Sequence, residues 1–170
     1  MLSQENAKMM RVGMGYDSHR FAAGRPLVLG GVTIPSDRGL LGHSDADALT
    51  HAVIDAVLGA AAAGDIGSHF PDTDPAWRRA DSMELLRIAH AAAAREGWRV
   101  CQVDATVILE APKLQPWIRD MAARLSDALG LPAGQVSVKA KTNEGMGFVG
   151  RGEGVAALAV ALLCGRDSRE

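Results

Sequence analysis

Alternation of apolar and polar residues predicts the first β-strands of this chain. Residues 98–110 and 135–141 both alternate, and β-branched side chains gather toward the end of the first stretch, as is typical of strands. Residues 27–29 and 32–34 flank Gly30-Gly31, a two-residue turn signal that predicts a β-hairpin.

Two further strands are expected near the ends of the chain. Residues 11–17 are strand-like, and their glycines allow another backbone or a ligand to come close. Residues 155–164 form an apolar run whose length fits a buried strand, although periodicity alone would also allow a helix. Because both faces of this strand are apolar, both need a cover, which a single small domain rarely provides. We therefore predict that a second copy of the chain covers one face.

A 3.6-residue period predicts a helix over residues 45–63, with Ser44 or Asp45 as its N-cap. His51 falls on the face opposite the main apolar stripe, together with Ile54 and Leu58, which indicates contact with another element or another subunit. The stripe that should pack on the sheet comprises Leu49, Ala52, Val53, Ala56, Val57 and Ala60.

Two more helices and one distinctive loop complete the pattern. Residues 81–84 form a capping-box pattern that opens a helix ending at Gly97. A further helix is predicted over residues 117–129. Residues 65–75 are dense in turn formers and side-chain acceptors, so we expect a functional loop there.

Composition limits the class of protein. The chain has 170 residues, enough for one domain, which we place at residues 11–164, between an extension (1–10) and a tail (165–170). The net charge of −2 provides no broad attraction for nucleic acid. The longest apolar run is too short to cross a bilayer and the N-terminus lacks a signal-peptide core, so a cytoplasmic protein without a membrane partner is expected.

Cys101 and Cys164 are the only cysteines, and their spacing matches no motif. We therefore expect neither a disulfide nor a thiolate metal site. Both are interpreted as buried apolar residues.

Asp17, His19 and His51 form a candidate metal site. Alternate side chains of an extended segment share a face, so Asp17 and His19 can present an oxygen and a nitrogen to one point, and a helix can deliver His51. Two histidines and a carboxylate suit Zn²⁺, with a fourth position open for catalysis. Alternatively, the Asp-x-His pattern is incidental and His51 pairs on the helix surface with Asp47 or Asp55.

Several motifs in a fixed order extend this picture. They lie at residues 17–19, 43–52, 55–60, 65–67, 70–74, 111–113, 142–144 and 150–154. Through them the chain resembles the 2-C-methyl-D-erythritol 2,4-cyclodiphosphate synthases over nearly all of residues 11–163. We predict an α+β fold: a two-layer sandwich with a small mixed β-sheet, helices on one face and a homotrimer interface on the other.

The resemblance implies a lyase of the non-mevalonate isoprenoid pathway, with active sites between subunits. The enzyme would convert 4-diphosphocytidyl-2-C-methyl-D-erythritol 2-phosphate, a cytidine diphosphate substrate, to the cyclic diphosphate and CMP. Asp17, His19 and His51 would bind one Zn²⁺ per subunit, and Glu144 would help to hold Mg²⁺ or Mn²⁺ bridging the substrate diphosphate. His43 and Thr142 would stabilise the transition state.

The resemblance also implies two groups of substrate contacts. The methylerythritol phosphate would meet the metal-site strand (Asp17, Ser18, His19) and His43, Ser44, Asp65, Ile66, Gly67, Phe70, Pro71, Asp72, Thr73 and Asp74. The cytidine and diphosphate would meet Leu109, Glu110, Ala111, Pro112, Lys113, Leu114, Gln115, Lys141, Thr142, Asn143 and Glu144, with Phe148 and Arg151 completing the contacts.

Three residues depart from the family pattern. Ala46 stands where glycine is more usual, and Lys141 and Asn143 stand where threonines are more usual. Simpler roles also exist for some expected contacts: the aspartates of residues 65–74 are common turn formers, and Arg151 has a ready ion-pair partner in Glu153.

Two other functions fit parts of the pattern. A zinc phosphohydrolase would need a dedicated general base, and we find no candidate. A cytidine-nucleotide or isoprenoid-diphosphate binding module would keep the pocket without turnover. The presence of Thr142 and Glu144 beside the complete metal triad argues against this alternative.

Overall fold

A computed structural model describes residues 9–165 of the chain. Its strands are β1 (Met10–Ala23), β2 (Leu27–Leu29), β3 (Val32–Ile34), β4 (Arg38–Leu40), β5 (Trp98–Ile108), β6 (Val136–Lys141) and β7 (Gly154–Gly165). Its α-helices are α1 (Ala48–Ala61), α2 (Ile66–His69), α3 (Ser82–Arg95), α4 (Ile118–Ala128) and α5 (Gly147–Gly150), and two 3₁₀ turns are η1 (Pro75–Trp77) and η2 (Gln115–Trp117).

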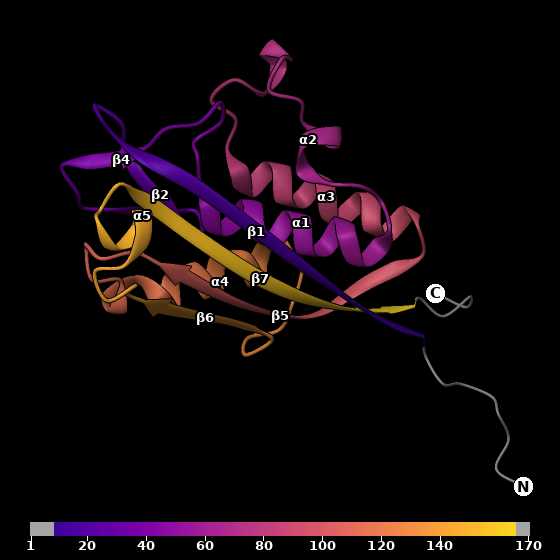
Figure 1. Cartoon of the computed structure of the whole chain (residues 1–170). Coiled ribbons are helices and arrows are strands. Elements are labelled where there is room, and N and C mark those ends of the chain that lie inside the picture. The colour runs from indigo at the N-terminus through magenta and orange to yellow at the C-terminus, as the bar shows by residue number, and fades with distance from the viewer. Residues whose placement is uncertain (1–8, 166–170) are drawn as a thin grey trace, which may run out of the picture.

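The main sheet has five strands in the order β4-β1-β7-β5-β6. Only the β5–β6 pair is parallel among the described pairs, so the sheet is mixed, as predicted. Helix α1 packs on β1 and β7, and α3 and α4 pack on β5 and β6 (Figure 1). The predicted hairpin forms a separate two-stranded sheet of β2 and β3, in which Leu27 pairs with Ile34. The α+β fold is therefore confirmed.

Two glycines of β1 allow this strand to lie directly against the backbone of α1. A Cβ atom on Gly15 would lie 1.9 Å from the carbonyl oxygen of Ala52, and one on Gly13 would lie 2.1 Å from that of Ala56. No side chain fits in that space. The close approach predicted from these glycines is thus made by a helix, and it brings the middle of α1 beside the middle of β1, next to Asp17.

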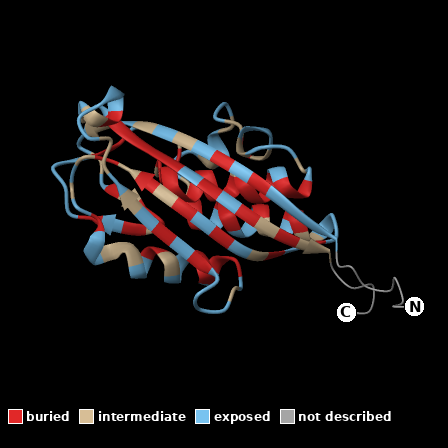
Figure 2. Ribbon diagram, turned by 60° about the horizontal axis from the view of Figure 1, so that its bottom comes forward, coloured by how far each residue is buried: buried red, intermediate tan, exposed pale blue. Residues whose placement is uncertain are grey.

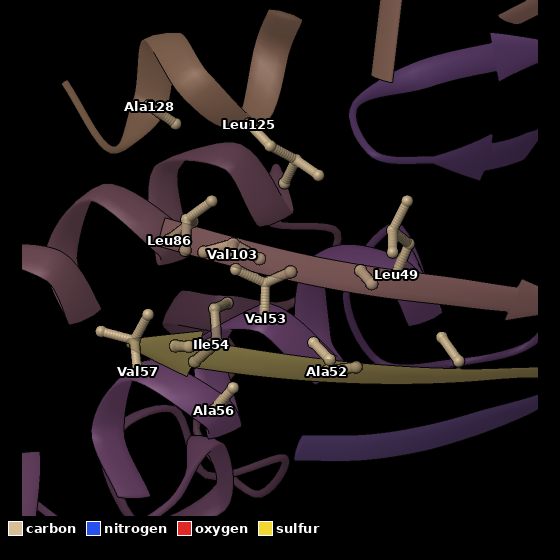
Figure 3. Close-up of a cluster of buried hydrophobic side chains, with 14 of the residues drawn as sticks. Leu49, Ala52, Val53, Ile54, Ala56, Val57, Leu86, Val103, Leu125 and Ala128 are labelled. Carbon is tan, nitrogen blue, oxygen red and sulfur yellow. The ribbon is translucent and has the colours of Figure 1, made fainter. Parts of the chain in front are cut away.

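A single hydrophobic core joins the helices to the sheet. Val53 and Val57 of α1 lie near Leu86 of α3, Val103 of β5 and Leu125 of α4 (Figure 3). All five side chains are almost fully buried. The central helix α1 is thereby packed against other elements on several sides.

The second face of α1 is also inside the molecule. Ile54 and Leu58 are fully buried, and α1 packs against α3. Of the two covers predicted for this face, the structure shows another element of the same chain.

The outer face of the sheet exposes large apolar side chains. Buried and exposed residues alternate along the long strands (Figure 2). Val12, Met14 and Tyr16 of β1 are 68%, 69% and 50% exposed, and Leu158 and Val160 of β7 are 36% and 43% exposed. Because these residues lie on paired neighbouring strands, they form one apolar surface, hereafter the outer patch.

Several predicted boundaries were wrong for identifiable reasons. The N-cap of α1 is Asp47, and neither Ser44 nor Asp45. The Asp47 carboxylate accepts from the backbone N–H of Thr50 and from both N–H groups of residues 30–31, so it also fixes the hairpin turn against the helix.

The helix α3 lacks the predicted capping box. Asp81 caps it by accepting from the Met83 backbone N–H, but the Glu84 side chain binds Arg87. At the ends of the chain, β1 already begins at Met10 and β7 continues to Gly165. The rest of the predicted extension (residues 1–8) and tail (166–170) lies outside the described residues.

The interpretation of the cysteines was also wrong. Cys101 and Cys164 form a disulfide, with their Cα atoms 6.3 Å apart. Cys101 lies in β5 and Cys164 in β7, and these two strands pair with each other. Cys101 sits at an irregularity of this pairing, between Val100 and Gln102. Within residues 9–165, no helix is long and apolar enough to cross a membrane.

Candidate functional site

Asp17, His19 and His51 meet at one point, as predicted. Asp17 Oδ2 lies 2.9 Å from both His19 Nε2 and His51 Nδ1, and the two nitrogens lie 3.1 Å apart. The first two residues alternate along β1, and His51 comes from the segment of α1 that the glycines bring close. Three potential ligand atoms thus form a nearly equilateral triangle.

The triangle fits a tetrahedral divalent cation. An ion with bonds of about 2.0–2.1 Å separates its ligand atoms by roughly 3.3 Å, slightly more than the separations seen here. The residues are half-buried or buried, with His51 only 7% exposed. Their two imidazoles and one carboxylate are the ligand types that zinc and similar ions accept. The site can therefore hold a divalent metal.

The electrostatics of the triad follow from its geometry. Burial opposes the charged forms of Asp17 and His19, but the close contacts of the Asp17 carboxylate with the imidazole rings outweigh it. The pKa of Asp17 is consequently well below its usual value, and the pKa of His19 is raised by the neighbouring carboxylate.

The other nitrogens of the two histidines have fixed partners. His19 Nδ1 lies 2.9 Å from the carbonyl oxygen of Leu41, to which it must donate, so Nε2 presents its lone pair to the triad. His51 Nε2 contacts the hydroxyls of Ser44 and Ser82 at 3.1 and 2.9 Å. Hydrogen-bond partners on the side away from the triad thus orient both rings.

The triad lies in a pocket of about 540 Å³. Ten of the expected site residues line it: Asp17, His19, His43, Ser44, His51, Ile66, Gly67, Phe70, Pro71 and Asp72. Trp77 and Leu85 line it too and were not predicted. Trp77 packs its ring edge-on against Phe70, 5.1 Å between centroids, and the only sequence signal for it was an aromatic residue just after the functional loop.

The aspartates of the functional loop have divided roles. Asp65 caps α2 and Asp74 caps η1, so these two carboxylates act as turn formers, the simpler role noted above. The Asp74 carbonyl oxygen also contacts His43 Nε2 at 3.2 Å. Asp72 lines the pocket, and Thr73 is exposed.

Ala46, at the departure from the family pattern, has a left-handed backbone with φ of 61°. This conformation is the one that glycine adopts most readily, which explains why glycine would be more usual. The alanine is nonetheless fully buried in the core.

The expected nucleotide contacts lie elsewhere. Leu109, Pro112, Lys113, Leu114, Gln115, Lys141 and Thr142 line a separate pocket of about 130 Å³. Glu110 organises the adjoining loop, because its carboxylate accepts from the backbone N–H groups of Asn143 and Gly145. Ala111 precedes Pro112 through a cis peptide bond and borders a further small pocket.

The remaining expected contacts lie outside the pocket of the triad. Glu144 accepts from the hydroxyl of Thr142, at 2.6 Å. Phe148 and Ser18 line a third pocket, of about 630 Å³, which His19 of the triad also lines. Arg151 forms an ion pair with Glu153, as the simpler alternative had it.

Fold and site together define an α+β protein with a candidate divalent-metal site in the wall of a large pocket. The chain matches the YgbB family over residues 10–164 and belongs to that family. It is 58% identical over 157 residues to the 2-C-methyl-D-erythritol 2,4-cyclodiphosphate synthase of Symbiobacterium thermophilum, a match that covers 92% of this chain and 100% of that one.

Solved structures agree with this assignment. A CDP-bound 2C-methyl-D-erythritol-2,4-cyclodiphosphate synthase is 43% identical, with a TM-score of 0.83, and the match covers 90% of this chain and 99% of that one. The Plasmodium falciparum IspF in a CDP complex is 31% identical, with a TM-score of 0.81, and the match covers 95% and 100%. The family predicted from the sequence motifs is therefore confirmed.

Proposed function

We propose that the chain converts 4-diphosphocytidyl-2-C-methyl-D-erythritol 2-phosphate into 2-C-methyl-D-erythritol 2,4-cyclodiphosphate, with release of CMP. The relatives carry the name of this activity, and two of the similar structures hold CDP. The single observation in this chain that carries the proposal is the triangle of Asp17, His19 and His51 in the wall of a pocket large enough for a sugar phosphate.

The reaction is an intramolecular phosphoryl transfer. An oxygen of the 2-phosphate attacks the β-phosphorus, and the bond from that phosphorus to the CMP oxygen breaks. The nucleophile is already an anion, so the protein needs no nucleophile of its own and no strong base. This is consistent with the pocket, whose histidines are held by hydrogen bonds and whose contribution is to position and stabilise.

A divalent cation bound by the triad supplies charge neutralisation between phosphates that otherwise repel each other. We propose Zn²⁺ for this position, since it accepts two imidazoles and a carboxylate. We also propose that Glu144 helps to hold Mg²⁺ or Mn²⁺ on the substrate diphosphate, as expected for an oxygen ligand.

His43 and Thr142 would donate hydrogen bonds where negative charge develops. Such a donor typically contributes about 2.7–4 kcal/mol to catalysis when its position is fixed in advance. His43 is oriented by its contact with the Asp74 carbonyl. The Thr142 hydroxyl, which here donates its one proton to Glu144, would turn to the substrate once Glu144 binds a cation. Bringing the two phosphates together contributes more, since well-oriented intramolecular reactions gain roughly 7–11 kcal/mol.

We further propose a homotrimer with active sites between subunits. The outer patch exposes five large apolar side chains, whose contact with water would be unfavourable in a monomer. The triad and the nucleotide-side residues line separate pockets of one chain, although one substrate would have to reach both. A neighbouring copy that covers the outer patch can supply the second half of each site.

The test is to incubate purified protein with the diphosphocytidyl substrate and Mg²⁺ and to follow phosphorus by ³¹P NMR. We expect CMP and a cyclic diphosphate in equal amounts. A linear product would instead indicate a zinc phosphohydrolase, and binding of the substrate without any product would indicate a nucleotide-binding module.

A further inference from the structure

A chain of hydrogen bonds lies behind His51, on the side of the ring away from the triad. His51 Nδ1 faces Asp17, while His51 Nε2 lies 2.9 Å from the hydroxyl of Ser82. Ser82 is fully buried and is the first residue of α3, so a third element of the fold reaches this ring. Neither Ser82 nor its partner Asp45 was among the expected site residues.

Asp45 determines how the Ser82 hydroxyl is used. The Asp45 carboxylate accepts the Ser82 hydroxyl proton in a short hydrogen bond, and it accepts the Ser82 backbone N–H at 3.0 Å. A serine hydroxyl has only one proton. Because Asp45 takes that proton, the Ser82 oxygen can only accept from His51.

This direction of bonding fixes the tautomer of the imidazole. His51 Nε2 must carry the proton that it donates to Ser82, which leaves the lone pair of a neutral ring on Nδ1, the atom that faces Asp17 and His19. Ser44 also contacts Nε2, at 3.1 Å, but Ser44 lines the pocket, so its own proton can turn to a bound molecule. Only Ser82 is locked by a carboxylate on its far side.

We propose that Ser82, held by Asp45, is a positioning residue that keeps His51 Nδ1 unprotonated and aimed at the cation site. The inference rests on the cation site of the proposed function and adds the residues that orient one of its ligands. Partners of this kind typically change metal affinity or activity by about 10–100-fold when they are removed.

The test compares zinc affinity in Ser82→Ala and wild-type full-length protein. Both are stripped with a chelator, and zinc is then titrated against a chromogenic competitor. We expect the zinc Kd of Ser82→Ala to rise by about 10–100-fold. The matched control is Ser126→Ala, which removes another buried serine hydroxyl, in α4 and outside the pocket lining, and should leave the Kd unchanged.

A second readout follows the imidazole itself. Histidine ¹⁵N shifts of the metal-free protein, recorded at a pH where the ring is neutral, should show His51 protonated on Nε2 in the wild type and a mixture of tautomers in Ser82→Ala. Should Ser82→Ala fail to fold, Asp45→Asn replaces it: an amide can donate to the Ser82 oxygen, which no longer has to accept from His51, so a weaker affinity is expected again.

The outcomes separate the two proposals. Equal zinc affinity and unchanged His51 nitrogen shifts in the folded variants would overturn the role of Ser82 and leave the proposed function intact. A wild-type protein that binds no zinc would overturn both.

Discussion

The two pockets that hold the expected substrate contacts are built differently. Around the triad, side chains from β1, α1 and α3 are half-buried or buried, and short polar contacts connect them in a continuous network. In the nucleotide-side pocket, Lys113, Gln115 and Lys141 are exposed, and order comes mainly from Glu110 gripping the backbone of the adjacent loop. All three candidate cation ligands thus come from one chain, whereas the nucleotide-side pocket is lined by exposed side chains that a neighbouring chain could cover.

The triad should fail as a unit when its carboxylate is removed. In Asp17→Asn, one anionic ligand becomes neutral, so zinc content should fall from one per chain to near zero and CMP release by more than about 100-fold, above the range for residues that merely orient ligands. Elemental analysis, an activity assay and circular dichroism measure metal, function and fold. Asp37→Asn, at an exposed site, is the control. A variant that keeps stoichiometric zinc would show that Asp17 is not a ligand.

At the outer patch, a substitution should abolish assembly and activity but leave zinc binding intact. Val160→Asp places a charge in the proposed subunit interface, where an unpaired buried charge costs about 3–5 kcal/mol. We expect light scattering to show monomers, with CMP release lost and one zinc per chain retained. Ile88→Asp alters a residue of similar exposure on α3 and should leave a trimer. A Val160→Asp trimer with full activity would refute the assignment of this face.

Packing between β1 and α1 should control the triad but not the second pocket. Gly15→Ala forces a methyl group against the Ala52 carbonyl, and such overpacking typically costs about 1–3 kcal/mol of unfolding free energy. Because the strand must move from the helix, zinc affinity should fall as well. Gly59→Ala is the control: nothing lies within 4 Å of its added methyl group, and the exposed helical position should gain about 0.5–1 kcal/mol. Chemical denaturation and zinc titration measure both effects.

The smallest effect concerns protons. In the cation-free protein, the lowered pKa of Asp17 stabilises the fold above its ordinary pKa of 3.8, an effect lost as pH falls through the folded value. The raised pKa of His19 stabilises it below 6.5, an effect lost as pH rises through the folded value. The free energy of unfolding of the cation-free protein should therefore be largest between about pH 3.8 and pH 6.5.

Because the pKa of His19 is raised by the Asp17 carboxylate, zinc binding should release protons at pH values below this raised pKa and should tighten as pH rises. Calorimetry in buffers of different ionisation enthalpy measures this release. Binding enthalpies independent of the buffer would contradict the raised pKa of His19.

Local signals in the sequence were enough for much of the fold. The turn at Gly30-Gly31 marked its hairpin, and the period of residues 45–63 marked α1. The true cap, Asp47, was missed because its carboxylate also binds a turn seventeen residues earlier, a tertiary contact that no local pattern reveals. The Cys101–Cys164 disulfide was missed for the same reason, since it depends on the pairing of β5 with β7.

The candidate site shows the same division. Asp17 and His19 were found because strand alternation places them on one face, and His51 because a predicted helix could deliver it; the family motifs added most of the pocket lining. Ser82 and Trp77 were not found, because their roles arise only where α3 and η1 fold back over the pocket. Side chains that act through a neighbour leave little trace in spacing.

The most direct test mixes two inactive variants. Asp17→Asn lacks the triad, and the double variant Thr142→Ala with Glu144→Ala lacks the nucleotide-side groups. Unfolded together in equal amounts and refolded, they form mixed trimers, and about a quarter of the sites at interfaces between chains then pair two intact halves. CMP release should recover to about that fraction of wild type. Activity no higher than that of the separate variants would contradict a site shared between neighbouring chains.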